Sequence, residues 1–238
     1  MTAATVLPRC RSLSIVLPAY DEEANVGRAI EAARTAGSRF TDDLEIIVVD
    51  DGSRDGTTDR VLAEAAVDPR VRLIRFPDNR GYGAAVKTGL QAATKELVFF
   101  TDSDLQFDLE QIGELLARSA EAGVVVGYRA DRSDSWPRKL NAWAWNRLQR
   151  ALFDLDVRDV DCAFKLFRRE VIASMPMRSE GAFFSTEILV RARAAGHRIV
   201  ELPVRHYPRR AGSPSGARVA VIARAFRELW RLSGDLRT

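Results

Sequence analysis

Short apolar runs alternate with longer amphipathic segments along the first half of the chain. The apolar runs, rich in Val, Ile, Leu and Phe, fall at 13–18, 44–49, 71–76, 98–101 and 124–126. Such nearly continuous runs are typical of strands buried on both faces of a parallel sheet. The segments between them predict helices at about 22–36, from about 55, up to about 93 and at 108–119. This alternation predicts an α/β fold with a parallel, doubly wound sheet and right-handed crossovers.

Polar clusters follow four of these predicted strands at the point where each strand ends. They are 20–23, 50–53, 79–83 and 102–106. The carboxyl ends of parallel strands meet at one edge of a sheet, where open α/β sheets bind their ligands. One such cluster could reflect turn chemistry alone. Four at one edge predict a site for a polar, phosphorylated ligand.

The last of these clusters has the clearest chemistry. Asp102 and Asp104 leave a buried strand together, and the amide of Gln106 follows two residues later. Oxygen ligands of this kind suit a Mg²⁺ or Mn²⁺ ion that also binds a diphosphate. Taken alone, an Asp-x-Asp triplet is better explained by helix capping or a turn. The other three clusters favour the metal site.

Two familiar glycine motifs of nucleotide-binding proteins are missing. No G-x-G-x-x-G follows the first strand, and the chain has no Walker A sequence. The G-x-G at 81–83 follows the third strand, where a dinucleotide fingerprint would be misplaced. Its glycines could equally ease a turn into a helix.

Composition indicates one globular domain with an anionic partner. The 238 residues suffice for one large core, and 46% hydrophobic with 29% charged residues is ordinary for a globular protein. Net charge is only +3, but arginines concentrate in the last third, which suggests phosphate or a membrane surface rather than nucleic acid. Cys10 and Cys162 are too few for a disulfide framework or a zinc site and indicate a reduced compartment. The chain shows neither a signal peptide nor an apolar run of about 20 residues that could span a bilayer.

The four clusters, taken in order, resemble the motifs of family 2 glycosyltransferases of GT-A fold. The matching segments are 18–22, 49–57, 79–83 and 102–106. A later segment, 161–169, narrows the resemblance to the branch with dolichol-phosphate mannose synthases and bacterial polyprenyl-phosphate glycosyltransferases. The resemblance covers roughly residues 12–213. It implies a Rossmann-like, mostly parallel sheet with helices on both faces.

The resemblance also implies roles for individual residues. The nucleotide-sugar would be bound by Pro18, Ala19, Tyr20, Glu22, Asp50, Asp51, Lys87, Asp102 and Ser103. A Mg²⁺ or Mn²⁺ ion would be held by Asp102, Asp104 and Gln106. The catalytic residues would be Asp104, Arg129 and Arg209, the last of them near the donor phosphates. The acceptor phosphate would face Arg129, Arg138 and Asn146.

Candidates for a general base are few. Inverting transfer to a hydroxyl needs a base within hydrogen-bond reach of that hydroxyl. His197 and His206 flank a predicted late strand at 198–204, and Glu187 is a reserve base whose simpler interpretation is a helix first-turn acid. A lipid phosphate is already an anion and needs cations instead of a base. The Arg-rich second half therefore fits a lipid phosphate better than a sugar hydroxyl.

Two basic amphipathic segments predict contact with a membrane surface. The first is a Trp-containing helix at 137–153, and the second lies within 214–238. The alternative for the first is packing against the domain itself, and for the second it is core packing or a dimer contact. Ala142 and Pro214 depart from the family pattern, and both departures concern the acceptor more than the donor.

We expect a single GT-A domain over 1–238, with a nucleotide-sugar half at 12–130 and an acceptor half at 131–213. The expected reaction is inverting, metal-dependent transfer of a hexose, with GDP-mannose as the first donor to consider, to a polyprenyl phosphate. The alternatives are UDP-glucose or another UDP-hexose, a soluble acceptor, and a non-catalytic nucleotide-binding membrane adaptor. The expected location is cytoplasmic and peripheral, at the membrane face, and a homodimer stays open.

Overall fold

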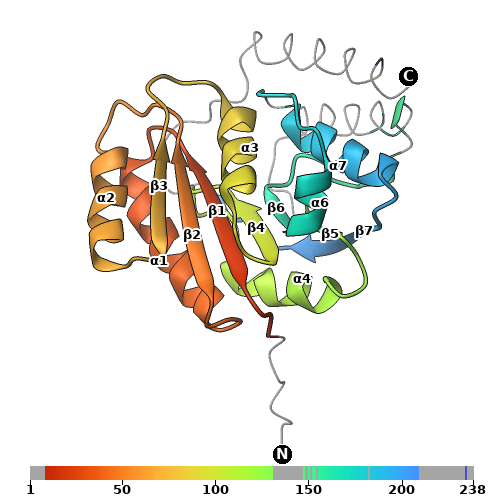
Figure 1. Cartoon of the computed structure of the whole chain (residues 1–238), viewed down its shortest axis with the longest axis horizontal. Coiled ribbons are helices and arrows are strands. Elements are labelled where there is room, and N and C mark those ends of the chain that lie inside the picture. The colour runs from red at the N-terminus through yellow and green to blue at the C-terminus, as the bar shows by residue number, and fades with distance from the viewer. Residues whose placement is uncertain are drawn as a thin grey trace, which may run out of the picture.

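The computed structural model describes residues 9–130, 147, 150, 152–153, 155–181, 183–208 and 234. Within these residues one seven-stranded sheet has the strand order β3-β2-β1-β4-β6-β5-β7 (Figure 1). The strands are β1 (Leu13–Ala19), β2 (Leu44–Asp50), β3 (Val71–Arg75), β4 (Leu97–Thr101), β5 (Val124–Arg129), β6 (Phe164–Arg168) and β7 (Ile199–Val204).

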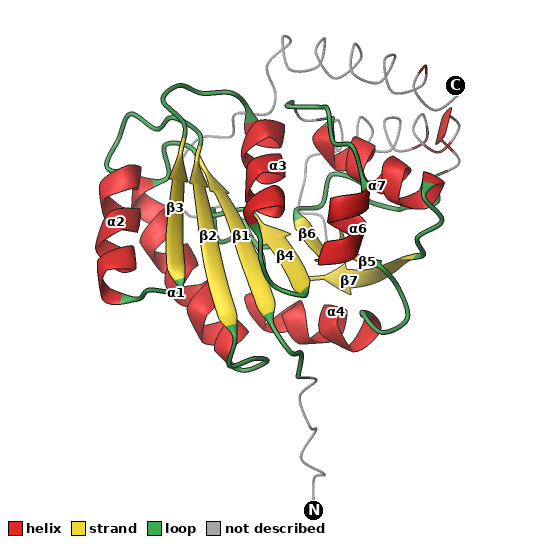
Figure 2. Cartoon of the chain, in the orientation of Figure 1, coloured by secondary structure: helices red, strands yellow, loops and turns green. Residues whose placement is uncertain are grey.

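Helices cover both faces of this sheet (Figure 2). They are α1 (Glu23–Ser38), α2 (Thr57–Val67), α3 (Tyr82–Ala92), α4 (Ile112–Arg118), α6 (Arg169–Ser174) and α7 (Phe184–Ala194), with a 3-10 turn η1 (Leu109–Gln111) before α4. Buried side chains of α1, α2 and α4 belong to one apolar cluster, and those of α3, α6 and α7 belong to a second. Successive strand residues alternate between the clusters, as Ile15, Val16 and Leu17 do, because side chains of a strand point to opposite faces.

The sequence-based predictions of strands and helices are confirmed for the first half of the chain. Each of the five apolar runs is a strand, and the helices predicted at 22–36 and 108–119 correspond to α1 and to η1 with α4. The fold class is therefore confirmed as α/β with a mostly parallel sheet. The late strand predicted at 198–204 is β7.

One strand of this mostly parallel sheet runs in the opposite direction. Strand β6 runs antiparallel to both of its neighbours, β4 and β5. Its residues Phe164–Phe167 are buried although Lys165 interrupts the apolar run. Because the lysine breaks the pattern, the periodicity of the sequence does not reveal this strand.

The reversed strand has a consequence for the site. The parallel pairings run from β2 to β1 to β4 and from β5 to β7, and β6 is antiparallel to both β4 and β5. One edge of the sheet therefore receives the carboxyl ends of β1, β2, β4, β5 and β7. Strand β6 begins at this same edge, so the turn that precedes it lies beside the ends of β4 and β5. The edge thus combines four kinds of polar segment: loops after β1 and β2, the Asp102–Gln106 turn, the end of β5, and the turn before β6.

Candidate functional site

The Asp102–Gln106 turn directly follows β4 and is fixed by its own residues. The Ser103 hydroxyl donates to the carbonyl of Pro18 at 2.8 Å, which ties the turn to the end of β1. The Gln106 backbone N–H donates to Asp104 Oδ1 at 3.1 Å. Leu105 has a φ of 61°, a left-handed conformation that lets the chain reverse tightly between the two polar residues. The turn therefore holds Asp102, Asp104 and Gln106 in one small region.

Asp102 is in an electrostatically unfavourable setting. Its Oδ1 is buried and has no hydrogen-bond partner among the described residues. Burial and the nearby charge of Asp104 raise its pKa to about 7, although the Tyr82 hydroxyl, Lys165 and Arg129 act in the opposite direction. A divalent cation would supply the missing partner and remove the repulsion between the carboxylates. The residues present therefore fit a bound Mg²⁺ or Mn²⁺.

Gln106 offers one side-chain oxygen beside the carboxylate oxygens of Asp102 and Asp104. Its Nε2 donates to the carbonyl of Tyr207 at 2.9 Å, which leaves Oε1 as the side-chain atom able to bind a cation. In the described part of the chain no three His, Cys, Asp or Glu side chains are grouped to hold a metal ion. A site with only two carboxylates is typical of Mg²⁺ that also binds substrate phosphates.

The predicted nucleotide residues Asp50 and Asp51 organise the loops after β2 and β3. Asp50 is fully buried, accepts the Ser53 N–H at 2.9 Å and accepts the Thr58 hydroxyl with its other oxygen. Asp51 accepts the backbone N–H groups of Arg80 at 2.7 Å and Gly81 at 2.9 Å. Burial raises the pKa of Asp51 against the effect of these donors. Both carboxylates shape the loops at the edge of the sheet, and their contact with a nucleotide stays a prediction.

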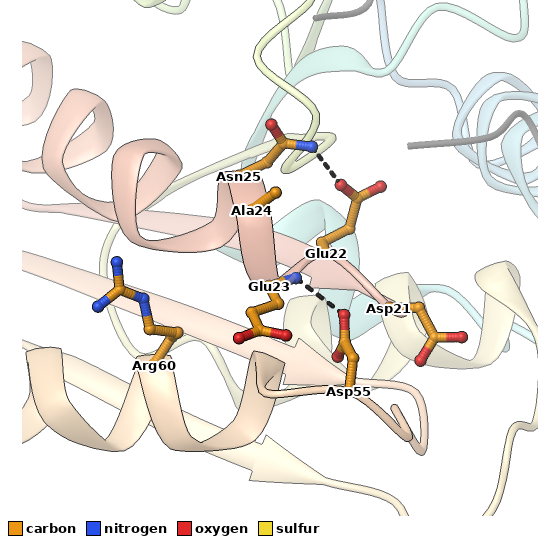
Figure 3. Close-up of a pocket in the computed structure, with 7 residues that line it drawn as sticks. All are labelled: Asp21, Glu22, Glu23, Ala24, Asn25, Asp55 and Arg60. Atoms are coloured by element: carbon orange, nitrogen blue, oxygen red, sulfur yellow. Dashed lines mark hydrogen bonds between the residues drawn. The ribbon is translucent and has the colours of Figure 1, made fainter. Parts of the chain in front are cut away.

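The segment after β1 forms an open cavity of about 540 Å³ (Figure 3). It is lined by Asp21, Glu22, Glu23, Ala24, Asn25, Asp55 and Arg60. Glu22 accepts the side-chain amide of Asn25 at 2.7 Å, and its backbone N–H donates to Thr57 at 2.9 Å. Asp55 accepts the backbone N–H of Glu23 at 3.1 Å. These bonds join the start of α1 to the loop before α2 and place Glu22 at the same edge as Pro18 and Ala19.

Other predicted nucleotide residues lie around this edge with differing exposure. Tyr20 directly follows β1, and 39% of it is exposed, so its ring is accessible to a planar ligand. Lys87 lies in α3, one turn beyond the Gly81–Gly83 segment, and is partly exposed. Gly83 is explained by packing, because a Cβ there would lie 2.4 Å from the carbonyl oxygen of Gly181. Gly81 has a φ of 106° directly before α3, so it serves the turn into that helix, which is the simpler interpretation of the motif.

On the acceptor side, Arg129 is the predicted residue that the structure describes. It is the last residue of β5 and forms a two-point contact with Asp159, Nε to Oδ2 at 2.7 Å and Nη2 to Oδ1 at 2.8 Å. Burial lowers the pKa of Arg129, but the hydrogen bonds and charge of Asp159 outweigh that effect and raise it. Arg138, Asn146 and Arg209 lie outside the described residues, as do most of 137–153 and 214–238.

Glu187 has the surroundings of a structural residue. It is 1% exposed and accepts the N–H groups of Arg178 at 3.0 Å and Ser179 at 2.6 Å. It also pairs with Arg191 one helical turn later at 2.7 Å. A carboxylate engaged by three donors holds the loop before α7 against that helix. These contacts favour the helix-acid interpretation over the reserve base.

The chain beyond β7 returns to the Asp102–Gln106 turn. Phe107 and His206 form an isolated antiparallel β-bridge, and their rings lie 5.1 Å apart. The Arg205 N–H donates to the Gln111 side chain at 2.7 Å. Residues 205–207 therefore lie along the turn that would bind the metal, and His206 serves this contact.

Sequence reasoning missed three residues of the site: Tyr82, Asp159 and Lys165. Tyr82 lies close to Asp102, Asp104 and Asp161, and these charges with burial raise its pKa well above the ordinary value. It is the central residue of the G-x-G at 81–83, so the motif was the signal that could have pointed to it. Lys165 belongs to the 161–169 segment, which carries the family resemblance, and Asp159 lies two residues before that segment. Their positions depend on the reversal of β6, which no local signal indicates.

Comparison with known proteins agrees with this geometry. The family model of glycosyl transferase family 2 matches residues 14–175. Glycosyltransferase AglD of Haloferax volcanii is 34% identical over 207 residues, which are 83% of this chain and 33% of that protein. An undecaprenyl-phosphate 4-deoxy-4-formamido-L-arabinose transferase of Aeromonas hydrophila is 33% identical over 203 residues, 84% of this chain and 61% of that protein. The chain thus spans between a third and about three-fifths of the length of these relatives.

Solved structures share the fold. Glucosyl-3-phosphoglycerate synthase of Mycobacterium tuberculosis, bound to Mn²⁺, UDP and glucosyl-3-phosphoglycerate, matches with a TM-score of 0.72 and 23% identity over 94% of this chain and 80% of that chain. The same enzyme with Mg²⁺ and UDP gives a TM-score of 0.73 and 20% identity, with the same coverage. At this level of identity the likeness establishes the GT-A type of sheet and its helices.

Proposed function

Because the chain belongs to glycosyl transferase family 2, we propose that it transfers a hexose from a nucleotide-sugar to a polyprenyl phosphate, with inversion and with a divalent metal ion. The observation on which the proposal rests is the pair Asp102 and Asp104 at the end of β4. One oxygen of Asp102 is buried without a hydrogen-bond partner in the part of the chain that the structure describes, and burial together with the neighbouring carboxylate raises the pKa of Asp102. Such a pair is suited to a cation and, through it, to a diphosphate.

The metal would be held by Asp102, Asp104 and the Oε1 of Gln106, and when bound it would neutralise the charge that develops on the leaving diphosphate. Ser103 fixes the turn that presents these atoms by its bond to Pro18. The loops built by Asp50 and Asp51 would bind the nucleoside, and Tyr20 offers an exposed ring beside them. Donor recognition is thus assigned to the edge formed by β1, β2 and β4.

On the acceptor side, Arg129 is the predicted residue within the described ranges, and none of the predicted acceptor residues is a carboxylate that could act as a base. Arg129 ends β5 and would face an anionic acceptor, whose phosphate oxygen would attack the anomeric carbon while the bond to the diphosphate breaks. A phosphate already ionised at neutral pH needs no proton removed. Glu187, the reserve base, is occupied by three donors. A polyprenyl phosphate agrees with the name of the Aeromonas relative.

The donor and the membrane contact are the finer parts of the proposal. GDP-mannose is the first donor to test, with UDP-glucose and other UDP-hexoses as alternatives. A polyprenyl phosphate resides in a membrane, so the protein would work at its surface. None of the helices in the described ranges is long and apolar enough to cross a membrane. The amphipathic segments 137–153 and 214–238 stay predictions of surface contact.

A transfer assay tests the proposal. Radiolabelled GDP-mannose, UDP-glucose and UDP-galactose are each incubated with a short polyprenyl phosphate, with Mn²⁺ or with EDTA. We expect label to enter the organic phase with one of the donors and only with the metal. Metal-dependent hydrolysis of a donor with no label in the organic phase would contradict the lipid acceptor while leaving a glycosyltransferase. Absence of both reactions would contradict the proposal as a whole.

A further inference from the structure

Arg129 is held in a fixed orientation by the buried carboxylate of Asp159. Asp159 accepts three hydrogen bonds from it, two from the guanidinium and one from the backbone N–H at 3.2 Å. The side chains of Arg129 and Asp159 are only 17% and 7% exposed. Parallel double hydrogen bonds between Arg and a carboxylate fix the plane of the guanidinium as well as its distance. The pair therefore determines where Arg129 points.

The contact leaves part of the guanidinium available. A guanidinium has five N–H donors, and Asp159 takes one from Nε and one from Nη2. Within the described residues no hydrogen bond joins Nη1 of Arg129 to another group. The edge of the guanidinium away from Asp159 thus keeps donors for an anionic oxygen.

The turn that presents Asp159 is fixed by a buried lysine. Lys165 is 0% exposed, and its Nζ donates to the carbonyl of Val160 at 2.9 Å and to that of Cys162. The same ammonium lies 5.3 Å from the centroid of the Phe100 ring. Burying an ammonium is unfavourable unless its donors are used. Here they are used to hold the 159–162 turn against the last residues of β4.

The antiparallel strand explains how this turn reaches the site. In β6, Phe164 pairs with Thr101 and Lys165 pairs with Phe100, so the turn lies beside Asp102. Strand β5 pairs with the other side of β6, and Arg129 ends β5. The 159–162 turn therefore lies between the predicted metal residues and the predicted acceptor residue. This buried segment therefore connects the donor half of the proposed site with its acceptor half.

We propose that Asp159 is a positioning residue for the acceptor: it aims Arg129 at the acceptor phosphate, and Lys165 fixes the turn on which Asp159 stands. This inference rests on the proposed function, in which Arg129 faces that phosphate. Whether acceptor binding becomes weaker or stronger when Asp159 loses its charge distinguishes a positioning role from simple electrostatics. Removing the negative charge of Asp159 makes the site more positive, which by charge alone would strengthen binding of an anion. If Asp159 positions Arg129, its loss weakens acceptor binding instead.

The test is a double-mutant cycle on the full chain. Asp159→Asn, Arg129→Ala and the double variant are compared for the KM of a short polyprenyl phosphate, kcat, and the Kd of UDP and of GDP by calorimetry. Asp159→Asn is expected to raise the acceptor KM about tenfold, the scale of one hydrogen bond to a charged group, and to leave nucleotide Kd unchanged. In the Arg129→Ala background the same change is expected to have under about a twofold effect. Asp156→Asn is the matched control, since Asp156 is a surface carboxylate of the same segment, 90% exposed.

The outcomes separate this inference from the proposed function. A lower acceptor KM in Asp159→Asn, or an equal rise in KM with and without Arg129, would overturn the positioning role. An Arg129→Ala variant with an unchanged acceptor KM, or a wild type that transfers nothing to the lipid, would overturn the acceptor assignment itself. If Asp159→Asn does not fold, Asp159→Glu takes its place in the cycle. That variant keeps the charge but displaces the guanidinium, so the same rise in KM is expected.

Discussion

Gln106 and Tyr207 are joined by two hydrogen bonds, although a hundred residues separate them in the chain. The Tyr207 N–H donates to the carbonyl of Gln106 at 2.7 Å, and the Gln106 side chain donates to the carbonyl of Tyr207 at 2.9 Å. The segment after β7 is thereby fastened to the turn that would bind the metal. In this arrangement the Gln106 side-chain nitrogen holds Tyr207, and its side-chain oxygen would bind the metal.

Replacement of Gln106 tests both tasks. In Gln106→Leu the side-chain bond to Tyr207 and the metal-binding oxygen are both lost, so we expect weaker Mn²⁺ binding and reduced transfer, about tenfold in each. Gln111→Leu is the matched control, because Gln111 fastens the same segment through the Arg205 N–H at 2.7 Å and has no place among the metal residues. Manganese titration followed by electron paramagnetic resonance makes the comparison. Equal Mn²⁺ affinity in the two variants would mean that Gln106 serves only as an anchor.

The raised pKa of Asp102 predicts a pH-dependent stability in the absence of metal. The ordinary pKa of this group in an unfolded chain is about 3.9, and burial with Asp104 raises it to about 7 in the folded protein. The folded state therefore retains the proton longer than the unfolded state, and stability falls as pH rises between these two values. Three pKa units correspond to about 4 kcal/mol at most.

Asp102→Asn measures this effect directly. In EDTA the variant should be more stable than wild type at about pH 8. Its advantage should become small near pH 4, where the folded state of wild type is protonated and the unfolded state is about half protonated. Chemical denaturation at the two pH values gives the comparison, and Asp108→Asn serves as a control for a nearby carboxylate. A constant difference between Asp102→Asn and wild type across this range would contradict the raised pKa.

Glu187→Gln is expected to act on stability rather than on chemistry. The change removes the ion pair between Glu187 and Arg191, whose side chain is 9% exposed, and the new amide group opposes the N–H donors of Arg178 and Ser179. Breaking a buried pair in this way destabilises a protein by about 3 kcal/mol. Urea unfolding measures the loss.

The control for Glu187 is a carboxylate of the preceding loop. Glu180 pairs with Arg80 at the surface at 3.0 Å, so Glu180→Gln is expected to change stability by less than about 1 kcal/mol. The folded fraction of Glu187→Gln should keep a kcat close to that of wild type. A large loss of kcat with unchanged stability would restore Glu187 as a base.

Gly52, in the loop after β2, can be compared with Gly196, which follows α7 and has a similar backbone conformation but open space around it. Both have positive φ, 73° and 82°, which is unfavourable for an alanine by about 1 kcal/mol. A Cβ at Gly52 would also lie 2.5 Å from the backbone of Asp78, whereas at Gly196 it meets nothing within 4 Å. Gly52→Ala should therefore displace the 78–81 loop and weaken nucleotide binding, and Gly196→Ala should not. Calorimetry with UDP and GDP tests this; equal affinities would show that the loop does not shape the nucleotide site.

Much of the fold could be predicted because most of the first five strands contain an uninterrupted apolar segment. Val98–Phe100 and Ile46–Val49 are apolar at every position. Both faces of a parallel sheet are covered by helices, so the side chains on both faces of these strands are apolar. The Asp102–Gln106 turn was predictable for a related reason. A buried strand that ends in two carboxylates has few structural explanations when other strands end in polar clusters as well.

The acceptor half could not be predicted in the same way. Strand β6 contains the buried Lys165, whose charge is satisfied by carbonyls of a turn three to five residues earlier in the chain. These hydrogen bonds depend on the tertiary structure, so they produce no periodic pattern in the sequence. The contact between Arg129 and Asp159 likewise depends on β6 entering the sheet in reverse. Sequence reasoning identified Arg129 through a family motif but had no basis for its partner.

The central claim is that Asp102 and Asp104 hold a divalent ion on which transfer depends, and one measurement addresses it most directly. Transfer of labelled sugar to a polyprenyl phosphate is followed against Mn²⁺ concentration for wild type, Asp104→Ala and Asp108→Ala. Asp108 is the control because it lies just beyond the turn and binds Glu110 and Arg205 instead. We expect wild type and Asp108→Ala to respond to Mn²⁺ alike, and Asp104→Ala to lose activity by about a hundredfold or more with little change in its thermal midpoint. Transfer by Asp104→Ala equal to that of wild type, or transfer by wild type unaffected by EDTA, would contradict the account.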